Sequence, residues 1–282
     1  MIKPALQDDA FLADLRNTRS DNAFFLWWLG QSGFLIRWGD RFLLLDPYLS
    51  DSLTNKCAST DKPHVRMTER VIRPGQLNCI DVITSSHNHT DHLDYETIVP
   101  ILRVNGVETA LVIPEANREF VANRLQCEPS FPIGLDAGQS ITVNGFTFHA
   151  VPAAHEKIDR DEAGRCHYLG YVVQFGPWTI YHSGDTIRYD GMIEALENFQ
   201  IDLALLPING AAPERRVAGN LDGPEAATLA HALGVRIVIP CHFEMFEFNT
   251  ADPRDLFLPE CGRLKQPCRV LRAGEGYIAP ED

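Results

Sequence analysis

The chain has 282 residues, of which 45% are hydrophobic and 22% charged, and its formal net charge at pH 7 is −13. A chain of this length and composition is typical of a globular protein that buries a substantial core in one or two domains. The acidic balance disfavours a broad contact with nucleic-acid phosphates and favours a small-molecule substrate.

The other global features predict a cytoplasmic protein. No apolar run approaches the roughly 20 residues of a membrane helix, so we expect no membrane insertion. Residues 1–9 lack the basic and apolar regions of a signal peptide. Seven cysteines without any Cys-x-x-Cys pair fit reduced thiols. No repeat or linker divides the chain, which predicts a single domain over residues 1–282, with residues 1–22 as a helical lead-in, and leaves homo-oligomer formation open.

The first elements in the chain are a predicted helix and three predicted strands. Apolar residues at near-helical spacing predict a helix over residues 4–19. Two β-rich pieces follow over residues 24–38, on either side of the turn Gly30-Gln31-Ser32-Gly33, and a third strand is predicted over residues 41–45. This strand ends in Asp46, and an acid in such a position is often only a turn former.

The loop over residues 49–77 is long, polar and interrupted by prolines. A loop of this length beside an active site is often a lid or a substrate wall, and a solvated surface loop is the alternative. Its side chains that could contact an anion are Lys56, Lys62, His64, Arg66, Arg70 and Arg73.

The six residues from His87 to His92 read His-Asn-His-Thr-Asp-His and follow a β-branched run over residues 80–84. Extended backbone after a strand sends the first two histidines to one side, so both imidazoles can face one ion. A helix that begins at Thr90 or Asp91 would turn Asp91 and His92 to another side of the same pocket. Four donors divided in this way predict two neighbouring cations.

The donor types limit the choice of metal. Imidazole and carboxylate groups without a thiolate suit borderline or moderately hard divalent ions, such as zinc, manganese or iron(II). They argue against a closed structural zinc site. The alternative, a polar surface turn, is disfavoured by the spacing of the donors directly after a strand.

The middle of the chain predicts elements that pack around further candidate ligands. Helices are predicted over residues 93–102 and 114–125, with a strand over residues 110–113 between them, and the Asn144-Gly145 pair predicts a hairpin over residues 140–151. This hairpin leads to His155. A second hairpin, over residues 168–181, leads to His182, which we expect to be structural or to support a ligand, and then to Asp185.

The last part of the chain predicts a strand over residues 201–207, a helix over residues 222–233 and a β-branched strand over residues 235–240 that leads to His242. The loop over residues 211–221 is a second candidate substrate wall. Four side chains of this half are predicted to contact an anionic substrate, with a solvated surface position as the alternative. They are Arg188, Asn209, Arg215 and Arg216.

The motif from His87 to His92 resembles the His-x-His-x-Asp-His signature of the metallo-β-lactamase superfamily of hydrolases. The resemblance implies an α/β fold, the αββα four-layer sandwich of two mixed β-sheets flanked by helices. It also implies two divalent metal ions, zinc or manganese, with iron as a further option. One ion would be held by His87, His89 and His155, and the other by Asp91, His92 and His242.

The same resemblance assigns roles to three carboxylates. Asp185 would bridge both ions, and Asp46 would orient a metal-bound histidine from behind. Asp91 would act mainly as a ligand and would also orient the attacking water or take up its proton. Asp91 and Asp185 are therefore the predicted catalytic residues.

Residues 24 to about 259 resemble the ascorbate-6-phosphate lactonase family. The shared segments are 27–30, 89–94, 181–185, 238–240 and 249–253. The resemblance implies a hydrolase that uses water activated by two metal ions on a small anionic substrate, above all a lactone of a sugar or phosphosugar.

Two alternatives stay open at this point. The segment from His87 to Tyr95 also resembles the phospholipase D that acts on N-acylphosphatidylethanolamine, which favours a phosphodiesterase for a lipid or a cyclic nucleotide. The second alternative is a non-enzymatic protein that binds a metal or another ligand on the same fold, and the complete ligand set weighs against it.

Overall fold

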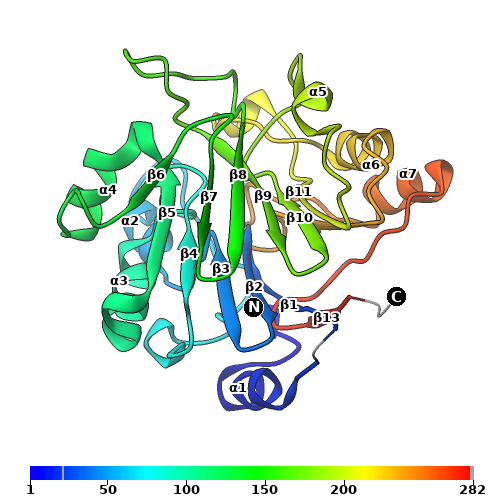
Figure 1. Cartoon of the computed structure of the whole chain (residues 1–282). Coiled ribbons are helices and arrows are strands. Elements are labelled where there is room, and N and C mark those ends of the chain that lie inside the picture. Colours follow the sequence, from blue (N-terminus) through cyan, green and yellow to red (C-terminus); the bar gives the residue numbers. More distant parts are fainter. Residues whose placement is uncertain (21, 280–282) are drawn as a thin grey trace.

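Two β-sheets lie face to face in the computed structural model, which describes residues 1–20 and 22–279 (Figure 1). Helices lie outside the sheets, α3 (Tyr95–Asn105) and α4 (Arg118–Leu125) on one side and α6 (Gly223–Ala232) and α7 (Phe257–Leu264) on the other. The predicted α/β sandwich of two mixed sheets flanked by helices is therefore confirmed.

The first sheet has seven strands within the described residues, in the order β13-β1-β2-β3-β4-β5-β6. Pairing is antiparallel from β13 to β3 and parallel from β3 to β6. The strands are β1 (Phe25–Gly30), β2 (Gly33–Trp38), β3 (Arg41–Leu45), β4 (Val82–Thr84), β5 (Ala110–Pro114), β6 (Ile133–Leu135) and β13 (Gly276–Ile278).

The second sheet has six strands in the described part of the chain, in the order β12-β11-β10-β9-β8-β7. The first three of these pair in parallel and the others antiparallel. The strands are β7 (Ser140–Val143), β8 (Phe146–Pro152), β9 (Leu169–Phe175), β10 (Trp178–His182), β11 (Leu203–Pro207) and β12 (Ile237–Cys241).

The core lies between the two sheets and under the helices. Strands β1, β10 and β11 are buried along their whole length, as expected where both faces of a sheet are covered. Aromatic rings join the layers, because Phe24 beside β1 meets Phe175 of β9 and Trp178 of β10 edge to face. The single-domain assignment stays a prediction, and one continuous apolar cluster from Phe11 to Ala279 agrees with it.

Most predicted elements form with small shifts of their ends. The lead-in helix is shorter than predicted, since α1 covers Asp8–Asn17, and residue 21 of the 1–22 lead-in and residues 280–282 of the domain lie outside the described residues. Helix α5 covers Met192–Leu196. Several short elements were not predicted: α2 (Ser52–Cys57), β6, α7 and β13.

The predicted helix start at Thr90 or Asp91 is wrong. The backbone N–H groups of His92 and Leu93 donate to the carbonyl oxygen of His89, which makes a turn, and α3 begins only at Tyr95. Asp91 and His92 therefore reach the pocket from a turn. No helix within residues 1–20 and 22–279 is long and apolar enough to cross a membrane.

Helix α6 begins with a capping box that fixes its first turn. The Asp222 side chain accepts a hydrogen bond from the Glu225 N–H at 2.8 Å, and the Glu225 side chain accepts one from the Asp222 N–H at 3.0 Å. Both N–H groups would otherwise lack partners.

We expect Asp222→Ala to lower the free energy of unfolding by about 1 kcal/mol, because the cap acceptor is lost. In a chain of this size the melting temperature should fall by roughly 2–4 °C, which calorimetry can measure. Asp222→Asn is the control, since its side chain keeps an acceptor oxygen. Equal losses in the two variants would contradict a capping role.

Candidate metal centre

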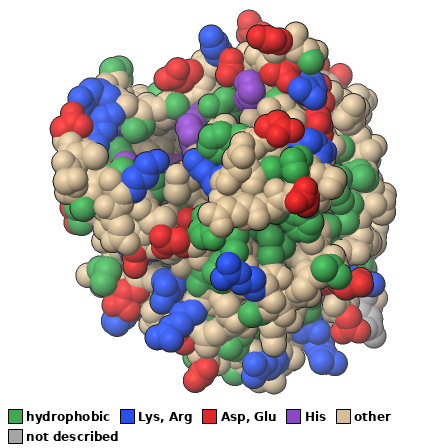
Figure 2. All heavy atoms as spheres, turned by 90° about the vertical axis from the view of Figure 1, so that its left-hand side faces the viewer, with side chains coloured by type: hydrophobic (Ala, Val, Ile, Leu, Met, Phe, Trp, Pro, Cys, Tyr) green, Lys and Arg blue, Asp and Glu red, His purple; other side chains and the backbone are tan. Residues whose placement is uncertain are grey.

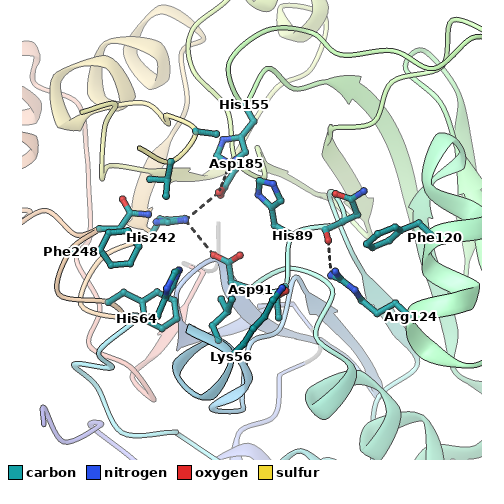
Figure 3. A pocket seen from close by; sticks show the side chains of 17 residues that line it. Lys56, His64, His89, Asp91, Phe120, Arg124, His155, Asp185, His242 and Phe248 are labelled. Atoms are coloured by element: carbon teal, nitrogen blue, oxygen red, sulfur yellow. Dashed lines mark hydrogen bonds and ion pairs between the residues drawn. The ribbon is translucent and has the colours of Figure 1, made fainter. Parts of the chain in front are cut away.

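Strand ends bring the candidate ligands to one edge of the sandwich. Side chains from both sheets meet there around a common space, as Figure 3 shows for His89, Asp91, His155, Asp185 and His242. The motif from His87 to His92 follows β4, His155 follows β8, Asp185 follows β10 and His242 follows β12.

His87, His89 and His155 form the first group. One ring nitrogen of each lies within 4.8 Å of one nitrogen of each of the others. Their ring centroids are 4.6 Å apart for His87 and His89, 5.0 Å for His89 and His155, and 5.4 Å for His87 and His155. Three imidazoles at such separations can share one cation.

Asp91, His92 and His242 form the second group, and their nearest ligand atoms also lie within 4.8 Å of one another. Asp185 lies between the two groups. Its carboxylate oxygens are 3.2 Å from the Nε2 atoms of His92 and of His242, and 3.6 Å from Nε2 of His155. A carboxylate in this position could contact a cation held by either group.

Hydrogen bonds to Nδ1 leave the Nε2 atoms facing the common space. His92 Nδ1 lies 2.7 Å from an Asp46 oxygen, and His155 Nδ1 lies 2.9 Å from the Gly219 carbonyl oxygen. Both partners are acceptors, so Nδ1 carries a proton, and the neutral form of each ring has its lone pair on Nε2. Asp46 is itself fixed by the Ser86 N–H at 2.9 Å and the Thr84 hydroxyl at 3.1 Å.

The donor set fits a divalent metal. His87 Nε2 is buried and has no hydrogen-bond partner among the described residues, whereas His92 Nε2 faces the Asp185 carboxylate at 3.2 Å. A buried polar atom without a partner is costly, and a cation would satisfy His87 Nε2. Burial is the main cause that lowers the pKa of His87 well below its usual range and also lowers that of His89, so both rings are neutral, as metal ligands must be.

The carboxylate between the groups is charged. Burial alone would raise the pKa of Asp185, but His242 and His92 hold it well below its usual range. Burial alone would lower the pKa of His92, but Asp185 and Asp91 raise it well above its usual value. Without a cation, the site therefore compensates its buried carboxylates through its own histidines.

Three residues of this centre have a strained backbone. Gln31, Asp46 and His242 have φ angles of 51°, 39° and 61°, in the left-handed region that residues other than glycine rarely adopt. Gly184, with φ 60°, passes so close to Ser86 that an added Cβ would lie 2.6 Å from the Ser86 Cβ. A glycine is required there for Asp185 to reach the cluster.

A cavity of about 470 Å³ opens above the histidines and aspartates. Figure 2 shows histidine side chains inside a hollow of this face, with basic side chains at its margin. Lys56 and His64 come from the 49–77 loop, and Phe120 and Arg124 come from α4. In Figure 3, His64 lies on the side of the cluster opposite Phe120 and Arg124. The remaining wall consists of Leu53, Asn88, Thr90, Val217, Ala218, Phe246, Phe248 and Asn249.

Comparison with known proteins identifies the family. The sequence profile of a family described as "Beta-lactamase superfamily domain" matches residues 41–243, which is well over half of the chain. The chain belongs to the metallo-β-lactamase superfamily. It is 30% identical over 256 residues to a UPF0173 metal-dependent hydrolase of Rubrobacter xylanophilus, which covers 88% of this chain and 93% of the relative.

Two further comparisons agree with this membership. A UPF0173 metal-dependent hydrolase of Methanosarcina mazei is 28% identical over 253 residues, covering 88% of this chain and 95% of the relative. A metallo hydrolase from Ignicoccus hospitalis has the same fold, with a TM-score of 0.66 at 20% identity over 92% of this chain and all of that chain. This chain is thus a metal-dependent hydrolase of the metallo-β-lactamase fold.

The four side chains predicted to contact the substrate are not among the residues that line the cavity. The Asn209 side chain is buried and donates to Asn249 at 2.9 Å. Arg215 donates to the Asn209 carbonyl oxygen, Arg216 pairs with Asp61 at 2.8 Å, and Arg188 is exposed. The hydrogen-bonding groups of Asn209, Arg215 and Arg216 are used within and between loops, and substrate contact by the four residues stays a prediction.

Two further buried residues near the centre are His182, which was predicted to be structural or to support a ligand, and Cys241. His182 is fully buried and its Nε2 lies 3.0 Å from the Ser32 carbonyl oxygen, behind the ligands, which agrees with a supporting position. Cys241 is 1% exposed, and burial raises the pKa of its thiol well above the usual value, so it behaves as a small apolar residue.

Several residues around the centre were not predicted from the sequence. Gln31 donates to Asp91 at 2.8 Å from the β1–β2 turn, and Tyr168 lies with its ring centroid 5.1 Å from that of His87. Arg124 and Phe120 belong to a helix interpreted as a packing element. For Gln31, the sequence offered one indication of a role at the centre, a polar turn between two buried strands. For Phe120 and Arg124 of α4, it offered no indication that they line the cavity.

We expect His87→Ala to lose at least one bound metal ion per chain and to abolish hydrolysis, because one of three neighbouring imidazoles is removed. Metal analysis after dialysis measures the first effect, and circular dichroism checks the fold. The matched control is His149→Ala, since the His149 ring contacts Gln174 and Phe199 outside the cavity. Full metal content with normal turnover in His87→Ala would refute the assignment.

Proposed function

We propose that this metal-dependent hydrolase uses a dinuclear centre on a small anionic substrate, with a sugar or phosphosugar lactone as the first candidate. The observation that carries the proposal is the position of Asp185, whose oxygens face Nε2 atoms of both histidine groups at 3.2–3.6 Å. A site for one ion would need only one of the two histidine groups, so the presence of both supports two ions. The proposed ligands are His87, His89, Asp91, His92, His155, Asp185 and His242.

The chemistry follows from the residues around this space. Divalent cations bound there would lower the pKa of water towards about 7 and polarise a substrate oxygen. Asp91 would orient the attacking water or accept its proton, because its carboxylate lines the cavity and lies 3.7 Å from Nε2 of His242. Asp46 keeps His92 in one tautomer, so Nε2 always faces the reacting side.

An anionic substrate is supported by the cations of the cavity wall. Lys56 has no hydrogen bond or ion pair with any described residue, and its side chain lines the cavity. The Arg124 Nη1 donates to the carbonyl oxygens of Asn88 and Leu93, which leaves its other N–H groups available. The carboxylates that line the cavity, Asp91 and Asp185, both belong to the proposed metal centre. A substrate anion is the missing partner for Lys56.

A phosphodiesterase is the second candidate, and the aromatic side chains of the cavity favour it. Phe120 is 42% exposed, and Phe246 and Phe248 also line the cavity. Such a wall fits an apolar or base-like group next to a phosphate. A phosphorylated lactone and a phosphodiester with an apolar substituent both carry an anionic phosphate. They differ in the group next to that phosphate.

A chelator experiment with a substrate panel tests the proposed function. Protein purified without chelators should hydrolyse a phosphorylated sugar lactone, lose this activity after metal removal, and regain it when manganese or zinc is added. Bis(4-nitrophenyl) phosphate represents the phosphodiesterase candidate. Activity on the diester alone would replace the lactone proposal, and turnover that survives complete metal removal would refute both.

We expect Lys56→Ala to raise the KM for an anionic substrate about tenfold with little change in kcat, because a hydrogen bond to a charged group contributes about 1.5 kcal/mol. Steady-state kinetics with matched charged and neutral substrates measure the effect. Lys157→Ala, at an exposed position outside the cavity wall, is the control. If Arg215→Ala and Arg216→Ala raise KM instead, the anion binds at the residues first predicted from the sequence.

The cytoplasmic location stays part of the proposal. All seven cysteines are free, which suits a reducing compartment. A small molecule is the proposed partner of the site, and the assembly state stays open.

A further inference from the structure

The turn between β1 and β2 is held beside the proposed metal centre by hydrogen bonds to its main chain. The His242 N–H donates to the Gln31 carbonyl oxygen at 3.0 Å, and the Trp28 indole N–H donates to the same oxygen at 2.9 Å. Gln31 is 1% exposed. Its place beside His242 is therefore set by the backbone, and its side chain has little freedom to leave.

The side-chain amide of Gln31 ends among the second group of proposed ligands. Its Nε2 atom lies 2.8 Å from Asp91 Oδ2 and 3.0 Å from His242 Nε2. Its Oε1 atom is buried and has no hydrogen-bond partner among the described residues. The amide thus places a donor next to two groups proposed to bind a cation and leaves its acceptor unused.

The contacts of the Gln31 Nε2 atom with Asp91 and His242 would change if a second cation were bound. The lone pair on His242 Nε2 would then be directed at the cation and could no longer accept an N–H. An N–H group beside a cation is also electrostatically unfavourable. A half-turn about the last side-chain bond exchanges the amide nitrogen and oxygen without other movement.

The distances suit a ligand of the same ion. Two ligand atoms that each lie about 2.1 Å from one ion, at right angles, are roughly 3 Å apart. The end of the Gln31 amide lies at this separation from both Asp91 and His242.

We propose that Gln31 is a further ligand of the second cation through its Oε1 atom. This inference rests on the dinuclear centre of the proposed function. A neutral oxygen ligand added to Asp91, His92, His242 and Asp185 raises the coordination number above four. Such a site favours manganese or iron(II), which take five or six ligands, over tetrahedral zinc.

Two substitutions separate a ligand role from simple hydrogen bonding to Asp91. Gln31→Leu removes both the acceptor and the donor. Gln31→Glu keeps an oxygen ligand but places a second carboxylate beside Asp91, so it would impair a site in which Gln31 only donates. The matched control is Gln200→Glu, which makes the same change at an exposed position.

The test is a titration of the metal-free proteins with Mn²⁺, followed by calorimetry and metal analysis, with thermal melting as a check on folding. We expect two ions per chain in the wild type and in Gln200→Glu. Gln31→Leu should keep the first ion and bind the second at least tenfold more weakly, and Gln31→Glu should retain both. Co²⁺ absorption of Gln31→Leu should become more intense, as coordination falls towards four.

Three outcomes would overturn the inference. Equal binding of both ions by Gln31→Leu and wild type would show that Gln31 is no ligand while leaving the dinuclear centre intact. Loss of the second ion in both Gln31→Leu and Gln31→Glu would assign Gln31 to donation towards Asp91. A wild type that binds one ion only would refute the dinuclear centre of the proposed function and this ligand with it.

Discussion

The burial of the Asp185 carboxylate is the constraint around which the site is arranged. The residue is 3% exposed at the end of a fully buried strand, and a buried carboxylate costs several kcal/mol unless opposite charge or donors surround it. His92 and His242 each place Nε2 3.2 Å from one of its oxygens, and the Ser32 hydroxyl donates from 3.4 Å. The groups that compensate this charge are the same groups that form the proposed metal centre.

Sheet register, more than local sequence, brings these groups together. Strands β3 and β4 pair in parallel, with Leu43 opposite Val82, so their carboxyl ends lie side by side. Asp46 can therefore accept from the Ser86 N–H and hold His92 in turn. In the second sheet, β10 and β12 each pair in parallel with β11, and their ends therefore open at one edge. Changes in this pairing would separate the ligands without altering any of them.

The sequence was informative about the fold and the centre because each candidate ligand follows a strand that its composition predicts. It was less informative about the turn after His89. There the helix begins only at Tyr95. The residue before it is Asp94, whose carboxylate accepts hydrogen bonds from the hydroxyls of Ser52 and Thr97. The cavity walls were hardest to predict. Arg215 and Arg216 resemble anion-binding residues, but loop contacts distant in sequence use their donors. Lys56, by contrast, has no hydrogen bond or ion pair with any residue that the structure describes.

The β1–β2 turn shows why such a contribution stays hidden in a sequence. A residue with φ 51° between two buried strands is read as a turn former, and turn chemistry alone accounts for a polar side chain there. Only the fold reveals that β12 ends beside this turn and that the His242 N–H donates to the Gln31 carbonyl oxygen. The same strained backbone that closes the hairpin directs the Gln31 amide to Asp91. The strained backbone at Gln31 therefore serves the proposed site as well as the connection between β1 and β2.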